Sequence, residues 1–156
     1  MSINTPGKVL VENVIKVKDG DTFKLELNLL FGVYIKRDCR LMGIDTPELN
    51  TQAGFLVTRF VEYWIANPPN KFVKLIWLSK RLETDVFGRS LGDLCFALYD
   101  ETFNNWVIQA SLVETLLRYQ LAKTIKATRH NWTEDELHQA FASASRVLGM
   151  GEVHGS

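Results

Sequence analysis

Apolar and polar residues alternate along the first part of the chain, a pattern typical of β-strands with one buried face. Residues 22–29 alternate strictly, and their apolar phase consists of Phe23, Leu25, Leu27 and Leu29. Residues 8–18 are rich in β-branched side chains, and Asp19-Gly20 between the two segments predicts a hairpin turn. Further strands are predicted at 33–44, 72–80 and 90–99, the last two joined by a polar turn.

The third predicted strand, residues 33–44, carries one basic residue near its end. Its apolar phase contains Val33, Ile35, Cys39 and Leu41. Arg40 falls in the opposite phase, so we expect it to point away from the more apolar face.

Three segments show helical spacing instead. Residues 51–66 form the first, and the prolines of the following segment, 67–70, end it. The second is predicted over 104–123 with an Asn cap at Asn104 or Asn105, and its apolar stripe is Trp106, Val107, Ala110, Val113, Leu116 and Leu117. The third, 132–149, opens with the capping box of Thr133 and Glu136 and closes at Gly149.

The order of these elements predicts an α+β fold. Five strands with a helix after the third, followed by two helices, suit a small closed or partly open β-barrel with helices packed against it. The 156 residues suit a single domain, 1–156, with a core at about 8–149. We expect residues 150–156 to form a flexible tail and the protein to be a monomer.

Composition limits the function classes. Lys plus Arg and Asp plus Glu both number 18, so any attraction to nucleic acid must be local rather than due to bulk charge. Cys39 and Cys95 stand alone, and we expect small buried thiols rather than a disulfide. No signal peptide or membrane-spanning run is evident, so we expect a cytoplasmic protein, with phage or plasmid origin as a hypothesis.

Residues able to carry chemistry lie at predicted strand ends or in loops: Asp19 and Asp21; Arg40, Asp45, Thr46 and Glu48; Asp85 and Arg89. If the barrel closes, Asp21 and Asp45 can converge as hard oxygen ligands for one divalent ion such as Ca²⁺. Arg40 and Arg89 suit phosphate binding, and Glu48 suits activation of water. Together these groups meet the requirements of phosphodiester hydrolysis.

Each motif also has a purely structural interpretation. The sequence DGDT alone is typical of a hairpin turn, and Asp45-Thr46-Pro47 alone is a turn signal. Arg89 alone fits a solvated turn residue, and Glu48 alone fits the start of a helix, where a negative charge is favourable. The joint occurrence of all these residues favours a functional site.

Three motifs carry a family resemblance. The sequences DGDT (19–22), RLMGIDTPE (40–48) and DVFGR (85–89) resemble the signatures of the staphylococcal nuclease (thermonuclease) family, in the same order and with similar spacing. The resemblance covers roughly residues 14–123. It implies a five-stranded OB-fold β-barrel with three α-helices, and Ca²⁺-dependent cleavage of DNA and RNA that leaves 3′-phosphate and 5′-hydroxyl ends.

The resemblance also assigns roles by position. Asp21 and Asp45 would bind the metal, together with the carbonyl oxygen of Thr46. Arg40 and Arg89 would bind phosphate and Glu48 would be the general base. Asp19 would be an outer neighbour of the metal.

The chain departs from the family around the phosphate and the base. Val86 and Phe87 stand where the family nuclease has Lys and Tyr, and Lys126 and Thr128 stand where it has two tyrosines. Trp132 or His130 would then have to supply any base stacking. The lysine-rich loop after DTPE is also missing, which predicts weaker and more salt-sensitive binding.

Asp85 and Lys126 remain candidates for weak substrate binding. The alternative function is a non-catalytic module of the same family that binds nucleic acid or protein. Retention of the two aspartates, two arginines and Glu48 favours the enzyme.

Overall fold

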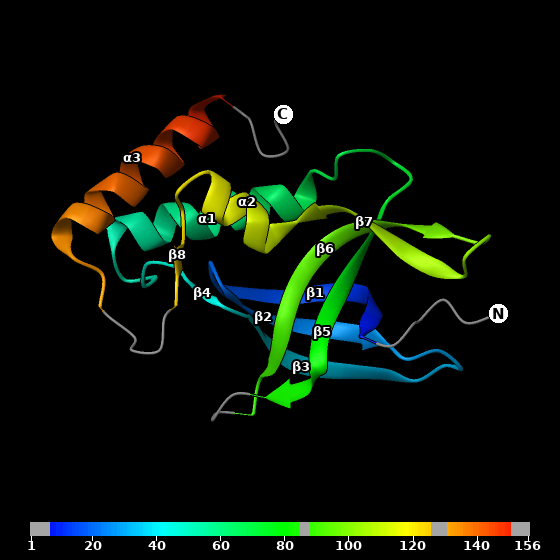
Figure 1. The fold of residues 1–156 in the computed structure, drawn as a ribbon. Coiled ribbons are helices and arrows are strands. Elements are labelled where there is room, and N and C mark those ends of the chain that lie inside the picture. The colour runs from blue at the N-terminus through cyan, green and yellow to red at the C-terminus, as the bar shows by residue number, and fades with distance from the viewer. Residues whose placement is uncertain (1–6, 85–87, 126–130, 151–156) are drawn as a thin grey trace.

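The computed structural model describes residues 7–84, 88–125 and 131–150 (Figure 1). The predicted C-terminal tail at 150–156 lies outside the described residues except for Met150. Five strands form the body of the fold: β1 (Lys8–Asp19), β2 (Thr22–Asn28), β3 (Tyr34–Leu41), β5 (Lys74–Thr84) and β6 (Ser90–Asp100).

These strands close into a barrel. Their order is β3-β2-β1-β5-β6 with antiparallel neighbours, and a parallel pairing of β3 with β6 completes the ring. The parallel register places Arg40 opposite Leu91 and Cys39 opposite Ser90. The predicted α+β fold, a five-stranded OB-fold-like barrel with three helices, is confirmed.

The barrel interior follows from the alternation in the sequence. Phe23, Leu25 and Leu27 of β2 are buried, whereas Lys24 and Glu26 between them are only partly covered. Leu29 lies outside β2 and is exposed. Cys39 and Cys95 are buried free thiols, as predicted.

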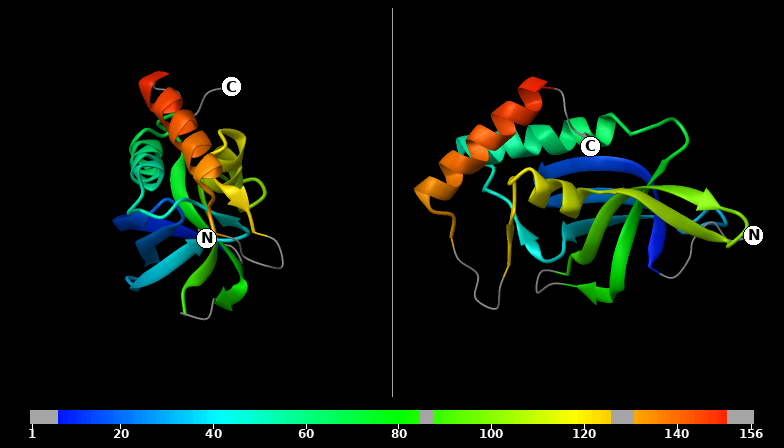
Figure 2. Two further views of the ribbon diagram at one scale, coloured as in Figure 1. Left: turned by 90° about the vertical axis from the view of Figure 1, so that its left-hand side faces the viewer. Right: turned by 45° about the horizontal axis from the view of Figure 1, so that its top comes forward.

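The three helices lie together on one side of the barrel (Figure 2). They are α1 (Gln52–Ala66), α2 (Leu112–Arg118) and α3 (Glu134–Met150). α1 begins after Thr51, whose hydroxyl accepts a hydrogen bond from the Gly54 amide at 2.9 Å. It packs against β1 and α3. No helix in the described part of the chain is long and apolar enough to cross a membrane.

The capping box predicted for the last helix is present at the start of α3. The Thr133 amide donates to Glu136 Oε1 at 2.8 Å, and the Glu136 amide donates to Thr133 Oγ1 at 3.1 Å. The predicted end at Gly149 is wrong by one residue, because Gly149 is helical and α3 ends at Met150.

The helix predicted over 104–123 is wrong in its first part. Residues Asn105–Ser111 form a strand, β7, which pairs antiparallel with β6, and Ser111 rather than an asparagine caps α2. Asn104 lies before β7 with a φ of 50°, a left-handed turn conformation. The apolar spacing in this segment is compatible with a helix or a strand. The segment forms a strand because it pairs with the edge of β6.

The third strand and the polar turn also have different limits from those predicted. β3 ends at Leu41, and Gly43, with a φ of 82°, turns the chain into a two-residue strand, β4 (Ile44–Asp45). β4 pairs antiparallel with β8 (Lys123–Thr124), which places Asp45 opposite Lys123. β5 continues to Thr84, well into the segment predicted to be a turn.

Candidate functional site

The turn between β1 and β2 brings two carboxylates to the end of the barrel. Asp19 pairs with Thr22, which leaves Gly20 and Asp21 as the two turn residues. A Cβ on Gly20 would lie 2.9 Å from the Thr46 hydroxyl, so only glycine allows this turn to approach Thr46 so closely. The predicted hairpin is therefore confirmed, and its glycine sets the distance between two motifs.

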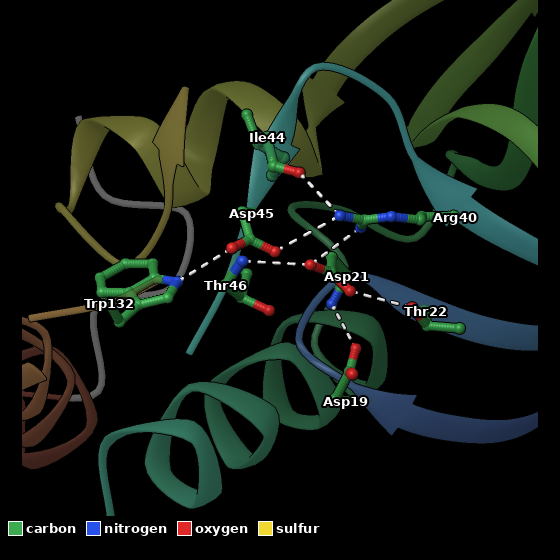
Figure 3. Close-up of polar contacts among 8 residues, drawn as sticks. All are labelled: Asp19, Asp21, Thr22, Arg40, Ile44, Asp45, Thr46 and Trp132. Atoms are coloured by element: carbon green, nitrogen blue, oxygen red, sulfur yellow. Dashed lines mark hydrogen bonds and ion pairs between the residues drawn. The ribbon is translucent and has the colours of Figure 1, made fainter. Parts of the chain in front are cut away.

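Arg40 joins the first motif to the second (Figure 3). Its Nη1 lies 2.9 Å from Asp21 Oδ2, and its Nη2 lies 3.4 Å from Asp45 Oδ1. Nη2 also donates to the Ile44 carbonyl at 3.3 Å. The three charged side chains are each only 7–8% exposed, so the pairing occurs out of water.

Arg40 lies in the opposite strand phase from Cys39 and Leu41, as expected from the sequence. This face of β3 is nevertheless shielded from solvent at Arg40, whose side chain is buried and which is only 6% exposed. The turn carrying Asp21 and the strand β4 cover the guanidinium.

Asp21 is held by several donors. Its Oδ2 accepts from the Thr46 amide at 3.0 Å, and its Oδ1 accepts from the Thr22 hydroxyl at 2.9 Å. Burial acts to raise the pKa of Asp21, but the hydrogen bond with Asp19 and the charge of Arg40 outweigh burial and lower this pKa. Asp21 is therefore the ionised member of the turn.

The pKa of Asp19 is shifted in the opposite direction from that of Asp21. Its Oδ1 accepts a hydrogen bond from the Asp21 amide at 3.1 Å. Burial, together with the hydrogen bond and charge of Asp21, raises the pKa of Asp19 to about 7. Negative charge is thus in excess at this end of the barrel.

Trp132 is a member of the cluster that sequence reasoning did not place there. Its indole Nε1–H donates to Asp45 Oδ2 at 3.1 Å. Lys123 Nζ lies 4.8 Å from the centre of the Trp132 ring, in cation–π geometry. The sequence offered Trp132 only as a possible base-stacking residue, because it lies outside all three motifs.

Glu48 lies at the edge of a pocket beside the cluster. The pocket has a volume of about 460 Å³ and is lined by Asp45, Glu48, Asn50, Thr51, Asn131, Trp132 and Leu137. The Glu48 carbonyl accepts from the Thr51 amide at 3.0 Å and from its hydroxyl at 2.7 Å. The backbone is thereby fixed at the start of α1 while the Glu48 side chain remains exposed.

Arg89 directly precedes β6, whose parallel pairing with β3 brings it to the same end of the barrel as Arg40. It is half-buried, and its charge contributes, after the hydrogen bond and charge of Lys18 and the charge of Lys24, to a lowered pKa of Asp38. Asp85 and Lys126 lie outside the described residues.

No family model matches the chain, and no curated protein matches it significantly.

The number and chemistry of the donor side chains decide whether the cluster fits a divalent cation. Among the described residues, no three His, Cys, Asp or Glu side chains gather closely enough to hold a metal ion. The donors that are present nevertheless fit Ca²⁺ in chemistry, because Asp21 and Asp45 supply hard carboxylate oxygens. The buried Thr46 Oγ1 makes no hydrogen bond in the described structure, so one polar atom beside the ion pair of Arg40 and Asp21 is unsatisfied.

Proposed function

We propose that this protein is a divalent-cation-dependent nuclease that uses Ca²⁺ to hydrolyse phosphodiester bonds of DNA or RNA, leaving 3′-phosphate and 5′-hydroxyl ends. The observation that carries the proposal is the buried Asp21–Arg40–Asp45 cluster beside a pocket with Glu48 at its edge. The resemblance of the three motifs to the staphylococcal nuclease family supports the same reaction.

Structural stability alone is a poor explanation for this cluster. Removing charges from water costs several kcal/mol per ion, and apolar residues of similar volume often stabilise a core equally well. The burial of Asp19 beside Asp21 adds a further electrostatic penalty, seen in the raised pKa of Asp19. Strained electrostatics of this kind are common at functional sites.

Each residue of the proposed site has a separate role in phosphodiester hydrolysis. Arg40 and Arg89 would bind the phosphoryl oxygens, where negative charge increases as the nucleophile attacks. Glu48, exposed at the pocket edge, would accept a proton from the attacking water. Asp21, Asp45 and the Thr46 carbonyl would hold Ca²⁺, with Asp19 as an outer neighbour. When bound, the cation supplies Lewis-acid stabilisation of the phosphoryl oxygen.

A non-catalytic binding module is the second candidate, and one observation favours it. The guanidinium of Arg40 already contacts both Asp21 and Asp45 and so is engaged by carboxylates in this structure. Such a cluster can serve as a fixed structural element under a surface that binds nucleic acid or protein.

Cleavage assays separate these candidates. Single-stranded DNA, duplex DNA and RNA are incubated with Ca²⁺, Mg²⁺ or chelator, and the ends of the products are tested for a removable 3′-phosphate. We expect Ca²⁺-dependent cleavage, lowered about 10²- to 10⁴-fold by Glu48→Gln. Glu62→Gln, at an exposed position on α1, is the matched control and retains activity.

Two results would count against the enzyme. Absence of metal-dependent cleavage by the wild type, with nucleic-acid binding retained, would support the binding module. Equal activity in Glu48→Gln and wild type would exclude the assigned base.

A further inference from the structure

Trp132 makes a directed contact with a carboxylate that the proposed function assigns to the cation. Its indole nitrogen lies 3.1 Å from Asp45 Oδ2, across 87 residues of sequence. An indole N–H can only donate, so the contact fixes Asp45 Oδ2 as the acceptor. Figure 3 shows Trp132 and Arg40 approaching Asp45 from different sides.

The two donors together fix the orientation of the Asp45 carboxylate. Arg40 Nη2 lies 3.4 Å from Oδ1, and Trp132 Nε1 approaches Oδ2. An ionised carboxylate has about four acceptor positions, so these two donors occupy only part of its accepting capacity.

The indole is itself held in place by its neighbours. Lys123 Nζ sits over the ring and also donates to the Asn131 carbonyl at 3.2 Å and to Glu136 Oε1 at 3.3 Å. Because Lys123 is paired with Asp45 through β8 and β4, the ring is fixed relative to the carboxylate that it contacts. One ring face is therefore covered by Lys123, which makes base stacking a less suitable role for Trp132.

We propose that Trp132 is a positioning residue that holds Asp45 in the orientation required to bind a divalent cation. The inference rests on the proposed function, because it assumes that Asp45 is a ligand. Hydrogen bonds to ligating carboxylates orient them, and loss of such a partner typically lowers metal affinity about 10- to 100-fold.

The test measures cation binding directly, without an activity assay. Ca²⁺ and Tb³⁺ affinities are determined by titration calorimetry for wild type, Trp132→Phe and Trp106→Phe. Trp106 is a buried indole on β7 and provides the same chemical change away from Asp45. Tb³⁺ emission excited through tryptophan reports in addition whether the bound ion lies close to an indole.

We expect Trp132→Phe to lower both affinities about 10-fold or more and to abolish most of the sensitised Tb³⁺ emission. Trp106→Phe should leave both readouts unchanged. Lys123→Met keeps the indole but releases its ring, and a smaller loss of affinity is expected. This variant provides the same test if Trp132→Phe does not fold, as judged by circular dichroism.

Two different failures can be told apart. If wild type binds the cations and Trp132→Phe binds them equally well, the positioning role is wrong and the proposed nuclease is unaffected. If Trp132→Phe does not fold and Lys123→Met binds as tightly as wild type, the positioning role is also wrong. If wild type binds neither cation, both the positioning role and the cation-dependent reaction are wrong.

Discussion

The Asp21–Arg40–Asp45 cluster predicts a large and specific loss of stability when its positive charge is removed. Arg40→Met keeps most of the aliphatic volume but leaves two aspartates that are 7–8% exposed without their counter-charge. Removing one partner of a buried ion pair typically costs about 3–5 kcal/mol, because the remaining charge is desolvated and unpaired.

The size of this effect can be compared with an exposed pair in the same protein. Lys18 and Asp38 lie 3.0 Å apart, almost the same separation as Arg40 and Asp21, but their side chains are 39% and 45% exposed. Exposed pairs contribute about 0–1 kcal/mol because water screens them. Lys18→Met is therefore the control, because it breaks an exposed ion pair of nearly the same length that has one carboxylate partner instead of two.

Urea unfolding of wild type and both variants measures the differences in free energy of unfolding, and thermal unfolding measures the differences in melting temperature. A protein of this size loses about 2–4 °C in melting temperature per kcal/mol, so we expect a decrease of about 6–20 °C for Arg40→Met and at most a few degrees for Lys18→Met. Adding Asp21→Asn and Asp45→Asn to Arg40→Met should restore much of the loss, because no uncompensated charge then remains.

Equal losses for Arg40→Met and Lys18→Met would refute the reasoning. They would mean that water reaches the cluster and that the guanidinium is not held in a low-dielectric environment. A triple variant no more stable than Arg40→Met would lead to the same conclusion.

Three further predictions concern the surroundings of the site and the core. Gly54→Ala should destabilise the protein and lower activity, because the new Cβ would lie 1.7 Å from the Glu48 carbonyl oxygen. A Cβ at Gly149 meets nothing within 4 Å, so Gly149→Ala should stabilise α3 by about 0.5–1 kcal/mol. Urea unfolding measures both changes in the free energy of unfolding. The pKa of Asp93 is raised, chiefly by burial, so the folded protein retains a proton that the unfolded chain releases, and stability should fall as pH rises above the ordinary value of 3.8. Asp93→Asn lacks this titration and should therefore gain stability relative to wild type as the pH rises above 3.8; a difference that does not change with pH would contradict this. Both cysteines are buried with raised thiol pKa values, so a thiol reagent should modify them only after unfolding.

Much of the barrel could be predicted from local pattern. The strict alternation in β2 and the capping box of α3 each depend on only a few neighbouring residues, and both predictions are confirmed. The segment of β7 is predicted as helix because Trp106, Val107 and Ala110 recur at helical spacing, although Trp106, Ile108 and Ala110 also fit the alternation of a strand. Its pairing with β6 is a tertiary effect that local periodicity does not contain.

The site shows the same division between local and long-range information. Motif spacing predicted that Asp21, Arg40 and Asp45 share one end of the barrel, and the structure brings them into contact. It did not predict that Arg40 is buried between the two carboxylates. The contact between Trp132 and Asp45 joins residues 87 apart, and nothing in either local sequence indicates it.

The pairing of β4 with β8 gives the site an order of assembly during protein synthesis. Asp21, Arg40 and Asp45 are synthesised before Lys123 and Trp132, the two residues that lie on the other side of Asp45. A ribosome-bound chain that lacks Lys123 and Trp132 contains the Asp21–Arg40–Asp45 cluster without the residues that lie on the other side of Asp45. The proposed nuclease activity would then begin only after Trp132 has left the ribosome.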